Sequence, residues 1–315
     1  MGNQVAERWT HPGVILVATD LSDTERLMPF AVQQAESTGA RLLLLHVLAT
    51  SESMAVDAVG MPYYDPAGAV ETASQMLQAW VAVARARKIA CEAMVREGNA
   101  AQQVLTTARQ VKADRILLGT RSRSKMSKLL LGSVAEQVLR SANIPVITVG
   151  PEAHLAVDVA DPEGIVLHAT TLREASRPSA ALACKIASDL NRELVLLHVL
   201  PPKDEMEHKG LPTGVDSLAL RELRIIAQET GCECSVAIEP HVVHGNPAIE
   251  ILAEAAGRHA CLIVLGATQR NVFQNLARDR TIYKVLAHAR CPVLTLREPK
   301  AEPEEAVLAR LATHR

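Results

Sequence analysis

The clearest sign of the fold is the segment Arg41-Leu-Leu-Leu-Leu-His-Val-Leu48, an almost continuously apolar run of strand length. A strand inside a parallel sheet is covered on both faces and has this pattern, whereas a half-buried strand alternates apolar and polar residues. Nearly the same segment returns as Leu194-Val-Leu-Leu-His-Val-Leu200, which matches residues 42–48 at six of seven positions. The chain therefore carries an internal repeat that includes a buried strand.

The repeat extends over most of the chain. Three more pairs of segments recur in the same order at a spacing of 147 residues (244 − 97): Glu97–Ala101 with His244–Ala248, Ile116–Gly119 with Ile263–Gly266, and Ile144–Val149 with Cys291–Leu296. This period is too long for a solenoid unit, so we expect two globular domains, residues 1–150 and 164–298. Residues 151–163, with two prolines and four acidic residues, are the expected linker, and residues 299–315 are a charged tail.

Strand-like runs alternate with helical periodicity in the first copy. We expect strands at Val14–Thr19, Arg41–Leu48, Cys91–Arg96, Arg115–Gly119 and Val146–Val149, and helices at Thr24–Thr38, Val70–Lys88, Ala100–Lys112 and Ser133–Arg140. This alternation is typical of βαβ units. The predicted fold is therefore α/β, with two tandem flavodoxin-like domains. Each would hold a five-stranded parallel sheet of order 3-2-1-4-5 with helices on both faces.

The composition argues against several classes of protein. The balance of 33 basic and 35 acidic residues does not favour nucleic-acid binding through bulk positive charge, and an aromatic content of 2% is too low for base stacking. No apolar run approaches the roughly 20 residues of a membrane span, and the N-terminal residues have no apolar signal-peptide core. Six cysteines without a CxxC pair are interpreted as buried thiols of a reducing cytoplasm. We expect a cytoplasmic protein that binds neither nucleic acid nor membrane.

In a doubly wound sheet, a ligand lies beyond the carboxyl ends of the strands where the strand order switches. In the order 3-2-1-4-5, this place follows strand 1 and strand 4. After strand 1, Ser22 and Glu25 have capping-box spacing, so Ser22 is expected to cap the first helix. The cap does not need Asp20, which is left either for a local turn or for a ligand hydroxyl or amino group.

The loop after strand 4 has features that suit a phosphate. Gly119 lets the backbone turn tightly, and Gly132-Ser133 opens a helix whose free amides favour an anion. Four basic residues lie between these glycines. Ser133 also has capping-box spacing with Glu136, and both roles are compatible. The loop is neither a Walker loop nor a dinucleotide-binding turn.

These segments resemble the nucleotide-binding branch of the universal stress protein family, and the likeness covers both copies. That branch carries Gly-x2-Gly-x9-Gly-Ser/Thr after strand 4, and this chain has Gly119-x2-Ser122-x9-Gly132-Ser133. The segment Ile15–Ser22 and the strand end His46-Val47 are also similar to the family. The resemblance implies the adenine nucleotide alpha hydrolase-like form of the fold, with ATP, or AMP or ADP, as the ligand.

The resemblance also implies roles for individual residues. Asp20, next to Thr19, would contact the ribose or adenine, and Val47 would line the adenine pocket. Gly119, Arg121 and Ser122 would wrap the ribose and phosphates. The phosphates would lie against Gly132, Ser133, Val134 and Ala135. Serine replaces the family's second glycine at position 122, which would cost about 1–2 kcal/mol if a positive φ is needed there.

The second copy departs further from the family pattern. Thr171 stands where Asp20 stands in the first copy, and Asp279-Arg280 replace Gly132-Ser133. An acidic side chain near a phosphate is repulsive, so ATP is expected in the first domain only. We expect no metal site at the histidines. His241 and His244 lie three apart along a strand and so face opposite sides.

The expected function is that of a stress-response protein that binds ATP or another adenine nucleotide in its first domain and acts as a regulatory binding module. No catalytic residues are predicted, because no acid–base pair or metal-ligand cluster converges on the site. Two alternatives stay open: a nucleotide-free interaction protein with both sites degenerate, and a weak ATP hydrolase. The resemblance further implies pairing of the last strands within one chain, an intramolecular pseudo-dimer, and leaves homodimer formation open.

Overall fold

A computed structural model describes residues 11–48, 66–120, 131–153, 164–172, 176–208, 214–231, 235–268 and 280–298. The chain forms two compact units and passes from one to the other between Pro151 and Glu152. The predicted tail and residues 154–163 of the predicted linker lie outside the described residues. No helix in the described parts of the chain is both long and apolar enough to cross a membrane.

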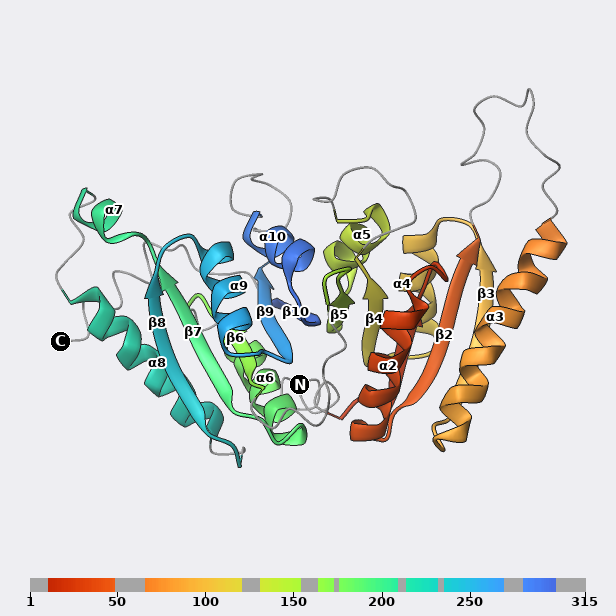
Figure 1. The fold of residues 1–315 in the computed structure, drawn as a ribbon, viewed down its shortest axis with the longest axis horizontal. Helices are drawn as coiled ribbons and strands as arrows, with labels where there is room; N and C mark the ends of the chain where they lie inside the picture. The colour runs from red at the N-terminus through yellow and green to blue at the C-terminus, as the bar shows by residue number, and fades with distance from the viewer. Residues whose placement is uncertain are drawn as a thin grey trace, which may run out of the picture. The chain divides into compact units, whose positions relative to one another are not determined.

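The first unit holds a five-stranded parallel sheet of order β3-β2-β1-β4-β5 (Figure 1), as predicted. Its strands are β1 (Val14–Ala18), β2 (Arg41–Leu48), β3 (Cys91–Glu97), β4 (Arg115–Gly119) and β5 (Val146–Val149). Its helices are α2 (Thr24–Thr38), α3 (Pro66–Ala86), α4 (Ala100–Gln110) and α5 (Ser133–Ser141). The largest difference from prediction is at α3, which begins at Pro66 rather than Val70. Proline is tolerated in the first turn of a helix, where its missing N–H has no partner to lose.

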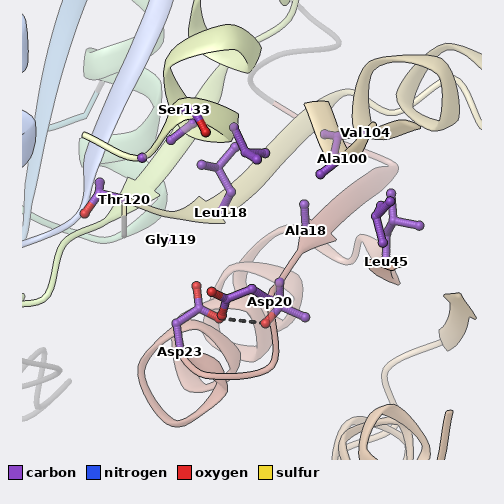
Figure 2. A pocket seen from close by; sticks show the side chains of 15 residues that line it. Ala18, Asp20, Asp23, Leu45, Ala100, Val104, Leu118, Gly119, Thr120 and Ser133 are labelled. Carbon is purple, nitrogen blue, oxygen red and sulfur yellow. Dashed lines mark hydrogen bonds between the residues drawn. The ribbon is translucent and has the colours of Figure 1, made fainter. Parts of the chain in front are cut away.

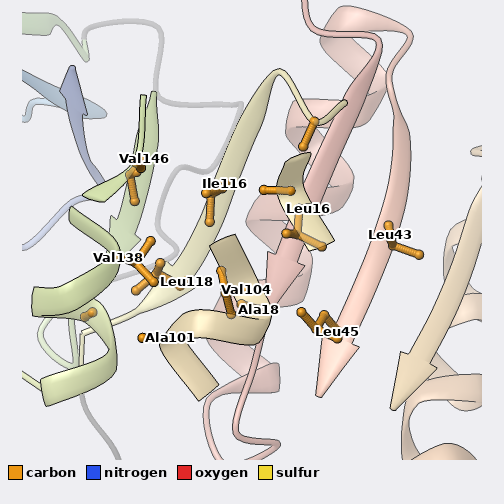
Figure 3. Close-up of a cluster of buried hydrophobic side chains, with 14 residues drawn as sticks. Leu16, Ala18, Leu43, Leu45, Ala101, Val104, Ile116, Leu118, Val138 and Val146 are labelled. Carbon is orange, nitrogen blue, oxygen red and sulfur yellow. The ribbon is translucent and has the colours of Figure 1, made fainter. Parts of the chain in front are cut away.

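Burial on both faces explains the continuous apolar pattern of β2. Leu43 and Leu45 pack with residues of α4 and α5 in one buried cluster (Figure 3). Leu42 and Leu44 are also fully buried, and because side chains alternate along a strand they face the opposite layer, where α2 and α3 pack on the sheet. The core therefore has two apolar layers, and the strand ends lie where these layers reach the edge of the sheet.

The second unit repeats this plan. Its parallel sheet has the order β8-β7-β6-β9-β10, which is again 3-2-1-4-5 when its strands are counted along the chain. The strands are β6 (Val166–Ala169), β7 (Leu194–Leu200), β8 (Ile238–His244), β9 (Leu262–Thr268) and β10 (Val293–Glu298). The helices are α6 (Arg177–Asp189), α7 (Lys203–His208), α8 (Val215–Gly231), α9 (Pro247–Gly257) and α10 (Arg280–His288). Helix α6 packs with α8, and α9 packs with α10.

Both predicted capping boxes are wrong. Helix α2 is preceded by Asp23 as its N-cap, whereas the N–H and hydroxyl of Ser22 donate to Oδ1 of Asp20, at 2.9 and 2.5 Å. The Asp20 carboxylate accepts from the Ser22 N–H and closes an Asx turn, and the Ser22 hydroxyl, which would accept from a helix N–H in a capping box, donates to the same carboxylate instead. Helix α5 is preceded by Gly132, so Ser133 is its first residue and not its cap.

The cysteines among the described residues divide into two groups. Cys91, Cys261 and Cys291 are buried free thiols, and burial raises the pKa of Cys291 to about 12. Cys184 on α6 is disulfide-bonded, so its interpretation as a buried thiol is wrong. Spacing alone did not reveal this bond, because a disulfide depends on which segments the fold brings together.

Candidate functional site

A cavity of about 170 Å³ lies at the carboxyl ends of β1, β2 and β4 in the first unit (Figure 2). Three kinds of surface line it. The apolar wall consists of Ala18, Leu45, Val47, Ala100, Val104 and Leu118; the acidic wall consists of Thr19, Asp20 and Asp23; and the glycine wall consists of Gly119, Thr120, Gly132, Ser133, Val134 and Ala135. This is the position expected for a ligand in a doubly wound sheet.

Eight of the ten residues predicted for the site line this single cavity: Thr19, Asp20, Val47, Gly119, Gly132, Ser133, Val134 and Ala135. The other two, Arg121 and Ser122, lie outside the described residues. The roles of all ten in binding stay predictions.

Sequence reasoning missed most of the apolar wall. Leu45 precedes Val47 by two positions on β2, so the two side chains face the same side of the strand, and this spacing was a usable signal. Ala100 and Val104 come from the first turns of α4, which begins after the Asn99 cap. Their approach to β1 and β2 depends on how α4 packs on the sheet, which no local pattern specifies. The wall contains no aromatic ring in the described residues.

Asp20 combines the two roles that the sequence left open. Its Oδ1 accepts the two hydrogen bonds of Ser22, and the same residue lines the cavity. The turn brings Leu21 to a φ of 69°, in the left-handed region. A local turn therefore holds the Asp20 carboxylate at the edge of the cavity.

Asp23 is the acidic residue that sequence reasoning missed. Its side chain does not cap α2. Instead, its Oδ1 accepts a hydrogen bond of 2.6 Å from the hydroxyl of Thr19, which in turn accepts from the N–H of Leu21 at 2.9 Å. Asp23 is only 8% exposed. Burial raises the pKa of Asp23 and the nearby Asp20 carboxylate raises it further, while the Thr19 hydroxyl opposes the rise.

The N-terminus of α5 forms the opposite end of the cavity. Gly132 has extended backbone, and its N–H donates to the carbonyl of Thr120 at 2.8 Å, which ties the helix start to the end of β4. No side chain caps this end. The first amides of a helix have no partner within the helix, so those of Ser133, Val134 and Ala135 suit an anion.

Two equivalent histidines hold the ends of the first strands. Nδ1 of His46 donates to the carbonyl of Thr19 at 2.9 Å, and Nδ1 of His198 donates to the carbonyl of Thr170 at 2.9 Å. Because a carbonyl only accepts, these nitrogens carry the hydrogen. The histidines therefore position the strand ends. No group of three or more potential metal ligands occurs among the residues that the structure describes.

The second unit differs at the matching place. The Thr171 hydroxyl lies 3.2 Å from that of Ser176, where the first unit has carboxylates. Arg280 begins α10 as Ser133 begins α5, which agrees with the spacing of 147 residues (280 − 133). Asp279 lies outside the described residues.

The fold and the cavity together define a tandem α/β protein with a small-molecule cavity at the carboxyl edge of its first sheet. The family model of the universal stress protein family matches residues 13–150 and again residues 164–297. The chain belongs to the universal stress protein family.

Individual relatives agree with this assignment. Over 305 residues the chain is 24% identical to a universal stress protein of Mycolicibacterium smegmatis, with 91% of this chain and 98% of the relative covered. It is 31% identical over 147 residues to a universal stress protein of Thermus aquaticus, with 43% of this chain and 96% of the relative covered. A crystal structure of a universal stress protein from Archaeoglobus fulgidus has the same fold, with a TM-score of 0.69, 20% identity, and 92% of this chain and 97% of that chain covered.

Proposed function

We propose that the first unit binds an adenine nucleotide, ATP or else ADP or AMP, and that the chain is a cytoplasmic regulatory binding module of a stress response rather than an enzyme. The observation that carries this proposal is the division of one cavity into an apolar, an acidic and a glycine wall. A nucleotide has a matching division into a base, a sugar and phosphates.

The apolar wall suits the base. Leu45, Val47 and Val104 would contact the faces of the purine through aliphatic carbons, and exclusion of water from these surfaces favours binding. The glycine wall suits the phosphates, because the free amides and positive dipole end of α5 attract negative charge.

Two features support a binding module over an enzyme. No histidine, cysteine or lysine lines the described part of the cavity, so it offers no general base other than a carboxylate. The acidic pair is also held by local hydrogen bonds to Ser22 and Thr19. Restriction of binding to the first unit is supported by the hydroxyls of Thr171 and Ser176 at the matching place in the second.

The proposal is tested by mass analysis of small molecules released from the denatured, freshly purified chain, followed by titration with ATP, ADP and AMP. We expect about one nucleotide per chain. Neither release nor binding would favour the nucleotide-free interaction protein, and steady turnover that a point mutation abolishes would favour the hydrolase.

A pair of variants locates the site. Asp20→Ala is expected to weaken nucleotide binding about 10- to 150-fold, because a hydrogen bond to a charged group contributes about 1.5–3 kcal/mol. Thr171→Ala removes the side chain at the matching position of the second unit and is the control, with no expected change. Unchanged affinity in Asp20→Ala contradicts the assignment of that residue.

A further inference from the structure

The carboxylate of Asp23 occupies an unusual place for a residue that precedes a helix. An alanine Cβ built on Gly119 would lie only 1.9 Å from Oδ2 of Asp23, so this oxygen lies directly against the backbone at the end of β4. Asp23 is 92% buried (100 − 8). It therefore takes up, inside the cavity, the space that a side chain at position 119 would fill.

The Asp23 carboxylate has few partners for a buried group. The Thr19 hydroxyl donates to Oδ1 and the backbone N–H of Asp23 itself also interacts with the carboxylate, whereas Oδ2 lies against Gly119 in a residue that lines the cavity. Two charged groups act on the pKa of this carboxyl, Asp20, which raises it, and Arg26, which lowers it and has the weaker influence. A buried carboxylate is costly unless hydrogen-bond donors surround it. Asp23 can therefore accept a further donor from a ligand.

The order of the walls tells which part of a ligand would supply this donor. In Figure 2 the apolar residues Val104 and Leu45 lie on the right and Ser133 at the upper left, while Asp20 and Asp23 lie below them at the lower left. In a nucleotide the sugar lies between the base and the phosphates. With the base on the apolar wall and the phosphates at α5, the sugar faces the two carboxylates.

Resting on the proposed function, we propose that Asp23 is a specificity-determining residue that accepts a hydrogen bond from a ribose hydroxyl and makes the site select ribonucleotides over deoxyribonucleotides. An ionised carboxylate only accepts hydrogen bonds, and a hydroxyl can donate one. Acidic residues accept from ribose hydroxyls in the same way in dinucleotide-binding folds. A deoxyribose leaves Oδ2 buried and without this donor, so it binds more weakly.

The test is calorimetric titration of the full chain with ATP, 2′-deoxyATP and 3′-deoxyATP. For the wild type, at least one deoxy analogue is expected to bind about tenfold or more weakly than ATP. In Asp23→Asn, which keeps an oxygen for the Thr19 hydroxyl, the affinity for ATP should fall to about the affinity that the wild type has for that analogue. The affinity for the analogue itself should change less than about threefold, because it never made this bond.

Glu25→Gln is the matched control, because Glu25 lies in the same helical turn but is exposed and outside the cavity. It should keep the full preference for ATP. If Asp23→Asn does not fold, Asp23→Ser gives the same measurement, since serine is favoured before a helix.

The outcomes separate the two proposals. Equal binding of all three nucleotides by the wild type, or an unchanged preference in the folded Asp23 variant, overturns the role of Asp23. Failure of the wild type to bind any of the three nucleotides overturns the proposed function itself.

Discussion

Replacing Gly119 by alanine tests the close approach of Asp23 to the end of β4. The new Cβ would meet Oδ2 of Asp23 at 1.9 Å and its Cγ at 3.0 Å. The aspartate side chain is short, so its carboxylate must swing away from Thr19 and lose the 2.6 Å hydrogen bond. Loss of a buried bond of this kind costs about 1–3 kcal/mol, and we expect the free energy of unfolding of the first unit to fall by that amount.

The assay is urea unfolding of the full chain followed by tryptophan fluorescence. Both tryptophans, Trp9 and Trp80, precede the boundary at residue 151 in the sequence, and Trp80 lies on α3 of the first unit, so the signal is expected to report on that unit. Gly13→Ala is the control. Its Cβ would lie at an ordinary 3.6 Å from Oδ2 of Asp114, and the free energy should change by less than about 1 kcal/mol.

A double-mutant cycle identifies the cause. Asp23→Ala removes the carboxylate, so adding Gly119→Ala in that background should cost less than about 0.5 kcal/mol. Equal stability of Gly119→Ala and Gly13→Ala would refute the reasoning. The same conclusion would follow if the cost of Gly119→Ala were unchanged in the Asp23→Ala background.

Two further predictions concern the second unit. His168 on β6 is fully buried, and burial lowers its pKa from 6.5 to about 4. The unfolded chain binds more protons between those values, so the free energy of unfolding should fall by up to about 3 kcal/mol as the pH drops from about 6.5 to 4. The stability measured by hydrogen exchange of β6 should fall over the same pH range in the wild type, and this fall should be absent in His168→Gln. An equal pH dependence in the variant contradicts the prediction. Because Cys184 is disulfide-bonded, Cys184→Ser and reductant should each lower stability by about 2–4 kcal/mol in thermal unfolding. Reductant should then have no further effect on Cys184→Ser, and an equal response of both proteins would count against the bond.

Local patterns predicted the frame of the site because they report on burial and chain direction. The apolar run at residues 42–48 indicated a strand covered on both faces, and β2 spans Arg41–Leu48 as predicted. The strand order then placed residues 19–20 and 119 at one edge of the sheet. Neighbouring parallel strands end at the same edge, so these residues had to meet.

The N-termini of the helices show a limit of prediction from local sequence patterns. Ser22 and Glu25 have the right spacing for a capping box, yet Asp20 takes both donors of Ser22. In a capping box the Ser22 N–H would donate to the Glu25 carboxylate and the Ser22 hydroxyl would accept from the Glu25 N–H, whereas here both Ser22 groups donate to Asp20. Hydrogen bonds of similar strength compete for them, and spacing along the chain does not rank these bonds.

The sequence by itself determined the duplication, the sheet order and the position of the cavity at the carboxyl edge of the first sheet. These follow from periodicity and from the geometry of βαβ units, which are properties of short segments. Only the tertiary structure decided that Asp23 lies against Gly119, that α4 contributes Ala100 and Val104 to the apolar wall, and that Cys184 is disulfide-bonded. The first two depend on contact between segments far apart in the chain, and all three depend on the packing of the unit rather than on a local pattern.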